Sequence, residues 1–152
     1  YNLFLQQTVA DALGADAKAI QESAAAEATR ELLQGIFGSD PGTTESQDLG
    51  NRLRVAQQLF MSLGFGNPDL SAFGKDGGRI VLRTSHYAMG RRAKWGAATA
   101  PVCHFAVGYW VGALAAAAGL NPERVRGCEV RCAASHSSQQ PDDSCVLEIE
   151  VL

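Results

Sequence analysis

The chain has 152 residues, of which 46% are hydrophobic and 19% charged, a composition typical of a globular domain rather than of a disordered chain. Its net charge of -3 leaves no large basic surface for the phosphate backbone of a nucleic acid, so nucleic acid is not an expected partner. The length allows a real hydrophobic core, and we expect a single domain over residues 1–152.

Two helical segments are predicted at the N-terminal end. The first spans Asn2 to Leu13 and lacks the charged start and small-residue cleavage site of a secretory signal, so we expect a cytoplasmic protein. The second spans Asp16 to Phe37 and ends at the turn-forming residues Gly38 to Gly42. Its apolar residues recur at helical spacing: Ile20, Ala24, Ala28, Leu32 and Ile36.

A further helix is predicted after this break, with Thr44 or Ser46 as its cap, and should run antiparallel to the helix before it. It ends at Gly64–Gly66, followed by Asn67 and Pro68. One face of it is apolar: Leu49, Leu53, Ala56, Leu59, Phe60 and Leu63.

The sequence period then changes to that of strands. Asp69 to Phe73 and Arg79 to Thr84 predict a hairpin with a turn at Lys75 to Gly78. The following segment, Ser85 to Gly96, has no clean period and predicts a loop with a possible helical turn.

An apolar helix is predicted from Thr99 to Ala118, stopped by Gly119 and by Asn121 with Pro122. The surrounding stretch from Ala97 to Leu120 contains no Asp, Glu, Lys or Arg and is about as long as a bilayer span. Because much of it is alanine and Pro101 lies near its start, we expect a buried helix and no membrane span.

The C-terminal segments Val125 to Arg131 and Val146 to Val151 predict a second hairpin around the polar loop Ala133 to Ser144. A register that follows this loop places Cys132 opposite Cys145, Val130 opposite Leu147 and Cys128 opposite Ile149. The order of elements predicts an α+β fold, in which N-terminal helices pack on an antiparallel sheet together with the apolar helix and the C-terminal hairpin.

The last third of the chain also contains candidate metal ligands: Cys103, Glu129, Cys132 and Cys145. Thiolate sulfurs with one carboxylate form an acceptable tetrahedral set for zinc. Glu129 and Cys132 point to opposite faces of a regular strand, so both reach one ion only if the strand bends or ends between them. Otherwise Cys128, on the same face as Cys132, is the rival fourth ligand.

Two other interpretations of the cysteines remain open. Cysteine is often a small buried hydrophobe, and the four positions lack a compact C-x-x-C pair. In an oxidising compartment, Cys132 and Cys145 would form a disulfide instead.

Several motifs resemble the 4-vinyl reductase or hydrocarbon-binding domain family. They are the run from Cys103 to Gly108 with Gly112, the motif Glu129-Val-Arg-Cys132, and Cys145-Val-Leu-Glu-Ile. Upstream, Leu63 to Gly66 and Ile80 to Ser85 resemble the same pattern, so the similarity is strongest over residues 50–152. The resemblance implies a fold related to the subunits of the TRAPP trafficking complex.

The resemblance also implies a zinc ion on Cys103, Glu129, Cys132 and Cys145. The loop before Cys145 is longer than is usual in the family, which keeps Cys128 as a substitute ligand. A closed four-ligand site has no open position for water, so such a zinc would staple the last helix to the hairpin rather than catalyse a reaction.

Hydrocarbon-binding members of the family enclose an apolar cavity beside the zinc, and this chain has aromatic residues suited to such a wall. Arg91 could meet a ligand carboxylate, whereas a solvated loop is the alternative for this segment. For each aromatic the alternative is simple core packing. The candidate ligand-binding residues are His86, Tyr87, Arg91, Trp95, His104, Phe105, Tyr109 and Trp110.

Three functions are compatible with these features. The first is a small-molecule-binding domain, with a structural zinc, that senses or carries a hydrophobic, aromatic or tetrapyrrole-like ligand. The second is an enzyme or enzyme accessory, reductase- or hydrolase-like, although no nucleotide-binding glycine loop is present. The third is a scaffold that dimerises through its helices; a homodimer is the expected oligomer.

Overall fold

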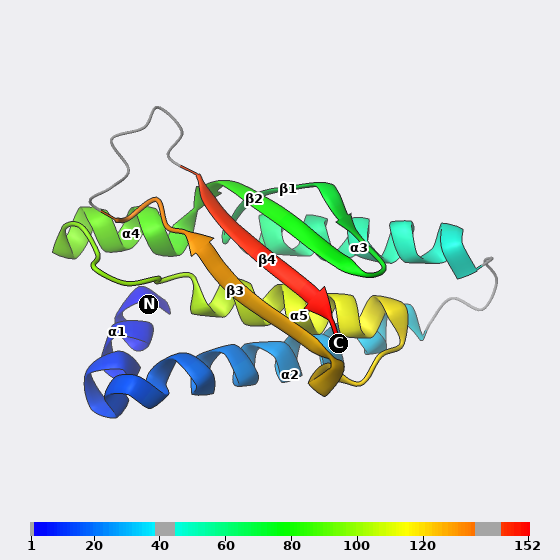
Figure 1. Ribbon diagram of the computed structural model, residues 1–152, viewed down its shortest axis with the longest axis horizontal. Helices are drawn as coiled ribbons and strands as arrows, with labels where there is room; N and C mark the ends of the chain where they lie inside the picture. The colour runs from blue at the N-terminus through cyan, green and yellow to red at the C-terminus, as the bar shows by residue number, and fades with distance from the viewer. Residues whose placement is uncertain (1, 39–44, 136–143) are drawn as a thin grey trace.

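The computed structural model describes residues 2–38, 45–135 and 144–152. The fold is α+β, as predicted, with helices on one face of a four-stranded antiparallel sheet (Figure 1). The helices are α1 (Asn2–Leu13), α2 (Ala17–Phe37), α3 (Glu45–Ser62), α4 (His86–Trp95) and α5 (His104–Ala118), with short 3-10 turns at η1 (Gly14–Asp16) and η2 (Pro122–Arg124). The strands are β1 (Gly66–Gly74), β2 (Gly77–Ser85), β3 (Val125–Arg131) and β4 (Cys145–Val151).

The two predicted hairpins join into one sheet of order β1-β2-β4-β3 because β2 pairs with β4. Side chains alternate between the two faces, as expected for a sheet that is covered on one side only. The covered face contains the buried residues Ile80, Leu82, Leu147 and Ile149, and the open face carries the exposed residues Arg79, Arg83, Glu148 and Glu150. Helices α3 and α5 therefore pack against the apolar face.

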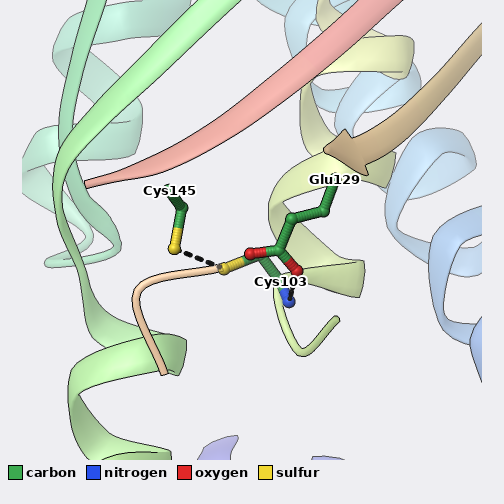
Figure 2. A group of neighbouring side chains, drawn as sticks. All are labelled: Cys103, Glu129 and Cys145. Carbon is green, nitrogen blue, oxygen red and sulfur yellow. Dashed lines mark hydrogen bonds between the residues drawn. The ribbon is translucent and has the colours of Figure 1, made fainter. Parts of the chain in front are cut away.

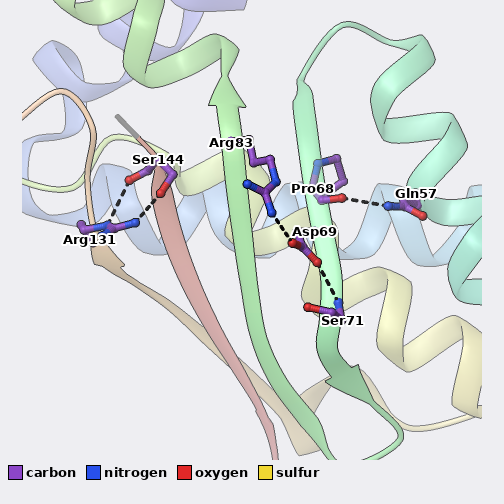
Figure 3. A network of polar contacts seen from close by, with 7 residues as sticks. All are labelled: Gln57, Pro68, Asp69, Ser71, Arg83, Arg131 and Ser144. Carbon is purple, nitrogen blue, oxygen red and sulfur yellow. Dashed lines mark hydrogen bonds and ion pairs between the residues drawn. The ribbon is translucent and has the colours of Figure 1, made fainter. Parts of the chain in front are cut away.

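Strand β1 lies at one edge of the sheet, where Pro68 is tolerated because an edge strand has a free side. The carbonyl of Pro68 accepts a hydrogen bond from Gln57 of α3 at 2.8 Å, and Asp69 pairs with Arg83 of β2 at 2.8 Å (Figure 3). The backbone N–H of Ser71, together with Arg83, holds the pKa of Asp69 below its ordinary value. These contacts fix the edge hairpin to α3 and to the sheet.

Helix α2 packs mainly against α5, and the contact depends on two glycines of α5. A Cβ atom at Gly108 would lie 2.2 Å from the Glu22 carbonyl oxygen, and one at Gly112 would lie 2.2 Å from the Ala26 carbonyl oxygen. The backbones thus approach too closely for any side chain at these positions.

The buried face of α2 differs from the apolar stripe that predicted the helix. Small residues such as Ala25 and Ala26, with Leu33, form the buried face, whereas Ile20, Leu32 and Ile36 are exposed. Close packing on glycines selects small partners, which explains why the larger apolar residues of α2 are excluded from the contact. The predicted cap Thr44 lies outside the described residues, as does most of the predicted break, and α3 already includes Ser46.

The segment predicted as a loop, Ser85 to Gly96, is a helix. Ser85 is its N-cap, with its Oγ accepting a hydrogen bond from the Ala88 N–H at 3.3 Å, and Gly96 ends the helix with φ 77°. The prediction was wrong because a strand leads directly into the cap, so no loop residues separate the two elements.

Helix α5 begins at His104, five residues later than predicted. Pro101 disfavours helical backbone in the residue before it, and the N–H groups of Val102 and Cys103 donate to the Glu129 carboxylate. Cys103 therefore occupies the N-cap position and is not part of the helix itself. None of the described helices is long and apolar enough to cross a membrane.

The predicted register of the C-terminal hairpin is correct at its loop end only. Arg131 pairs with Val146, in the same register that would place Cys132 opposite Cys145. Further from the loop, Glu129 pairs with Leu147 and Cys128 pairs with Glu148. The one-residue difference is taken up by a β-bulge between Glu129 and Arg131. This bulge is the bend that allows Glu129 and Cys132 to share a face.

Candidate metal centre and ligand pocket

Three of the four predicted metal ligands converge beneath the sheet. Figure 2 shows the side chains of Cys103, Glu129 and Cys145 pointing toward one another. One ligand atom of each lies within 4.8 Å of those of the other two. They come from the start of α5, the end of β3 and the start of β4, which are brought together by the helix cap and the hairpin. The Sγ atoms of Cys103 and Cys145 are 3.5 Å apart.

The carboxylate of Glu129 is held on one side and free on the other. Its Oε2 accepts hydrogen bonds from the N–H groups of Val102 at 2.8 Å and Cys103 at 2.9 Å. Its Oε1 is buried and has no hydrogen-bond partner among the described residues. A buried carboxylate oxygen without a partner is costly, and a cation beside the two sulfurs would satisfy it.

The surroundings of the thiols in this cluster raise their pKa values. The hydrogen bond to Cys145 lowers the pKa of Cys103, but burial and the charge of Glu129 outweigh it and raise that pKa above its ordinary value. For Cys145, the hydrogen bond with Cys103, together with burial, raises the pKa. The thiols are therefore protonated when no positive charge is near, and a divalent cation must displace their protons to bind.

Cys132 lies next to this group without belonging to it. Its side chain is buried, and a hydrogen bond with Cys145, together with burial, raises its pKa. Its neighbour Arg131 bonds both the carbonyl oxygen and the hydroxyl of Ser144, which holds the two ends of the long loop together (Figure 3). Cys132 is thus the nearest described candidate for a fourth position.

Cys128, the rival ligand, is placed elsewhere. It is exposed on the open face of the sheet, opposite Glu148. The bulge turns Cys132 inward and leaves Cys128 outside the cluster.

Ser85, the last residue of β2 and the N-cap of α4, supports the cluster. Its hydroxyl is 3.1 Å from Cys103 Sγ and 1% exposed, while the Ala133 N–H donates to Cys145 Sγ at 3.3 Å. Because Ser85 Oγ already accepts the Ala88 N–H, its own hydrogen is free to donate to a Cys103 thiolate.

Replacing Ser85 with alanine is expected to weaken zinc binding by about 10- to 100-fold, since such supporting hydrogen bonds orient metal ligands. Loss of the helix cap should also cost about 1 kcal/mol of stability. Chelator competition measures the first effect and denaturation of the metal-free protein the second. Unchanged zinc affinity beside a measurable loss of stability would mean that Ser85 acts only as a cap.

An apolar pocket of about 300 Å³ opens between α1, α2 and the starts of α4 and α5. Two of its walls, Tyr87 and Phe105, were predicted ligand contacts, and their ring centroids are 5.5 Å apart. Burial, and after it the charge of Cys103, raises the pKa of Tyr87, so its phenol stays neutral. The remaining lining residues are Leu5, Gln6, Val9, Gln21, Ala24, Ala25 and Ala28.

A smaller adjoining hollow of about 110 Å³ contains three other predicted residues, Arg91, Trp95 and His104. It shares Gln6 and Tyr87 with the larger pocket. Arg91 donates to the Gly96 carbonyl and lies over the Trp95 ring, and His104 Nδ1 is 3.5 Å from Glu22 Oε1. Arg91 and His104 thus already have protein partners.

The last three predicted ligand residues lie away from this pocket. Tyr109 and Trp110 pack in the core around Phe60, with ring centroids 4.9 and 5.6 Å from it, and the Tyr109 hydroxyl donates to the Ala56 carbonyl. His86 is exposed at the start of α4. Core packing, the alternative interpretation, describes Tyr109 and Trp110 in this structure.

Gln6 and Gln21 were not among the predicted site residues. The sequence gives no signal for them, because each stands among other polar residues, Gln6 before Gln7 and Gln21 before Glu22. Their place in a pocket follows only from the position of α1 beside α2.

Among solved structures, the fold is similar to that of the phenol-responsive sensory domain of the transcription activator PoxR, determined with phenol. The TM-score is 0.68 at 18% sequence identity, and the match covers 98% of this chain and 72% of that chain. At this identity the likeness shows the fold alone. No protein-family model matches the chain, and no curated protein matches it.

Proposed function

We propose that this chain is a small-molecule-binding domain for a compact hydrophobic ligand, in a sensor or carrier role. The observation that carries the proposal is the apolar pocket of about 300 Å³, whose walls Tyr87 and Phe105 adjoin the metal-ligand cluster. The similar solved domain is a sensor of phenol, which supports an aromatic ligand for this chain too.

The size of the pocket narrows the ligand class. A volume of about 300 Å³ is at the lower end of small-molecule sites. This volume suits a molecule of one or two rings. A tetrapyrrole, one of the ligands expected from the sequence, is too large for it.

The metal forms the second part of the proposal. Cys103, Glu129 and Cys145 would hold a zinc ion, with Cys132 as fourth ligand after a small movement of its side chain. The unpartnered Glu129 Oε1 and the donors aimed at the two sulfurs support this assignment. With four protein ligands, zinc would supply stability and would not activate a water molecule.

The same elements build both sites. Ser85 and Cys103, which are in contact, stand directly before α4 and α5. Two residues further along each chain segment, Tyr87 and Phe105 form the pocket wall. A metal that fixes Cys103 would therefore fix the relative position of these two walls.

Filling the pocket is expected to weaken binding. In an Ala28→Phe variant the new ring would occupy the space between α1 and α2, and phenol affinity should fall at least about tenfold. Tenfold corresponds to about 1.4 kcal/mol, which is less than the loss of two buried methylene-sized contacts at about 0.8 kcal/mol each. Ala19→Phe, on an exposed position of the same helix outside the pocket lining, is the matched control.

Ligand-observed NMR and calorimetry with phenol would measure both variants. Wild type and Ala19→Phe should bind alike, with Ala28→Phe reduced. Equal binding by all three proteins would place the ligand elsewhere.

A larger groove is a weaker candidate for this ligand. It has a volume of about 590 Å³ and lies between α2, α5 and β3. Charged side chains line it, including Glu22, Glu27, Arg30, Glu123 and Arg126, so an apolar guest would find fewer apolar contacts there.

Exposed apolar side chains support a second candidate function, a scaffold that dimerises through its helices. Large apolar side chains of α1 and α2 remain exposed, among them Phe4, Ile20, Leu32 and Ile36. A homodimer through these helices is compatible with ligand binding and stays a prediction.

A further inference from the structure

We propose that Gln6 and Gln21 recognise the polar group of the ligand, and that this group is uncharged and both donates and accepts a hydrogen bond. The assignment rests on the proposed function, because it concerns the same pocket. It narrows the ligand to an aromatic compound with a hydroxyl or a carboxamide.

Gln6 supplies the acceptor. Its Nε2 donates to the Val102 carbonyl, which fixes the orientation of the amide. The remaining atom, Oε1, is buried and has no hydrogen-bond partner among the described residues. Gln6 thus has one acceptor whose hydrogen bond is not made by any residue that the structure describes.

Gln21 supplies the donor. It lies on α2, across the pocket from α1, and its Nε2 is buried without a partner among the described residues. Each such unmade hydrogen bond costs about 1–3 kcal/mol. A ligand between the helices would recover this cost if a small rotation of the Gln21 side chain turned its amide toward the ligand, while the Gln6 amide keeps the orientation set by Val102.

The rest of the lining determines the charge of the ligand. None of the described residues that line the pocket carries a charged side chain, and Tyr87 stays neutral. A carboxylate would enter without a counter-charge and could not donate to Gln6 Oε1. A hydroxyl or a carboxamide satisfies both glutamines with one group.

The position of Gln6 is also tied to the metal-ligand cluster. The peptide group between Val102 and Cys103 accepts from Gln6 at its carbonyl and donates to Glu129 Oε2 at its N–H. The acceptor is therefore held in place by the same peptide that orients the carboxylate, and the pocket is organised before a ligand arrives.

The test uses four probes of similar size: phenol, benzamide, toluene and benzoate. Wild type is expected to bind phenol and benzamide at least about tenfold more tightly than toluene, with benzoate weakest, since tenfold corresponds to about 1.4 kcal/mol. Gln21→Leu and Gln6→Leu should each remove most of this preference while toluene affinity stays the same or rises. Gln34→Leu, on the same helix as Gln21 but outside the lining of the pocket and of the adjoining hollow, is the matched control and should keep the preference.

Calorimetry and ligand-observed NMR give the affinities, and thermal unfolding shows whether each variant is folded. If Gln21→Leu does not fold, Gln21→Met replaces it in the comparison. An unchanged preference for phenol over toluene in both glutamine variants would overturn the assignment while leaving the binding function intact. Binding of none of the four probes by wild type would overturn the proposed function and this assignment together.

Discussion

Replacement of Cys145 with alanine is expected to abolish stoichiometric zinc binding. Cys145 Sγ lies 3.5 Å from Cys103 Sγ and accepts the Ala133 N–H, so it stands at the centre of the donor cluster. Its loss would leave the Glu129 carboxylate and the thiols of Cys103 and Cys132, one ligand short of a closed structural site. Metal analysis of protein purified under reducing conditions should give one zinc per chain for wild type and none for the variant.

The loss of metal should also appear as a loss of stability. A ligand that binds only the folded state stabilises it by about 4 kcal/mol when its free concentration is 1,000 times Kd. Denaturation with and without zinc should show this difference for wild type and not for Cys145→Ala. Cys128→Ala is the matched control, because Cys128 is exposed on the other face of the sheet. A variant at Cys128 that loses zinc, or one at Cys145 that keeps it, would contradict the ligand assignment.

Replacement of Gly112 with alanine is expected to destabilise the fold by about 3 kcal/mol, the upper end of the usual cost of overpacking. The new methyl group would lie 2.2 Å from the Ala26 carbonyl oxygen, and backbone of a neighbouring helix cannot move aside as a flexible side chain could. Helices α2 and α5 would have to separate, which would also widen the groove of about 590 Å³ between them.

Gly50→Ala is the control for this substitution. Gly50 lies on an exposed position of α3 with nothing within 4 Å of an added Cβ, so alanine there should stabilise the protein by about 0.5–1 kcal/mol. Denaturant unfolding of the two variants measures both effects. Equal stabilities would contradict the close packing of α2 on α5.

Most elements of the fold follow from local patterns in the sequence. Strand β3 has the predicted bounds, and β1 and β2 contain the predicted strands. The pairing of β2 with β4 could not be predicted in this way, because it joins segments that are distant in sequence and depends on burying the shared apolar face.

The errors have tertiary causes. Helix α4 was missed because its cap, Ser85, directly ends a strand, and α5 starts late because Val102 and Cys103 donate to Glu129 rather than continuing a helix. In both places the backbone is organised by contacts around the metal-ligand cluster. Local propensity contains no information about such contacts.

The candidate site was predictable in part. Hairpin spacing and the family resemblance together named Cys103, Glu129 and Cys145, three residues that do converge. The prediction assumed a regular strand, so its register was wrong beyond the bulge. Glu129 and Cys132 would point to opposite faces of a regular strand, and the bulge allows them to share one face. The pocket was less predictable, because aromatic residues that fill a core and those that line a cavity have the same sequence pattern.

The most direct test of the proposed metal-supported binding domain is the X-ray absorption spectrum of zinc in the purified protein. A closed structural site on Cys103, Glu129, Cys132 and Cys145 predicts three sulfur neighbours at about 2.3 Å and one oxygen at about 2.0–2.2 Å. Two sulfurs with two lighter neighbours would indicate an open position and contradict the structural role. Protein without stoichiometric zinc would contradict the metal site altogether.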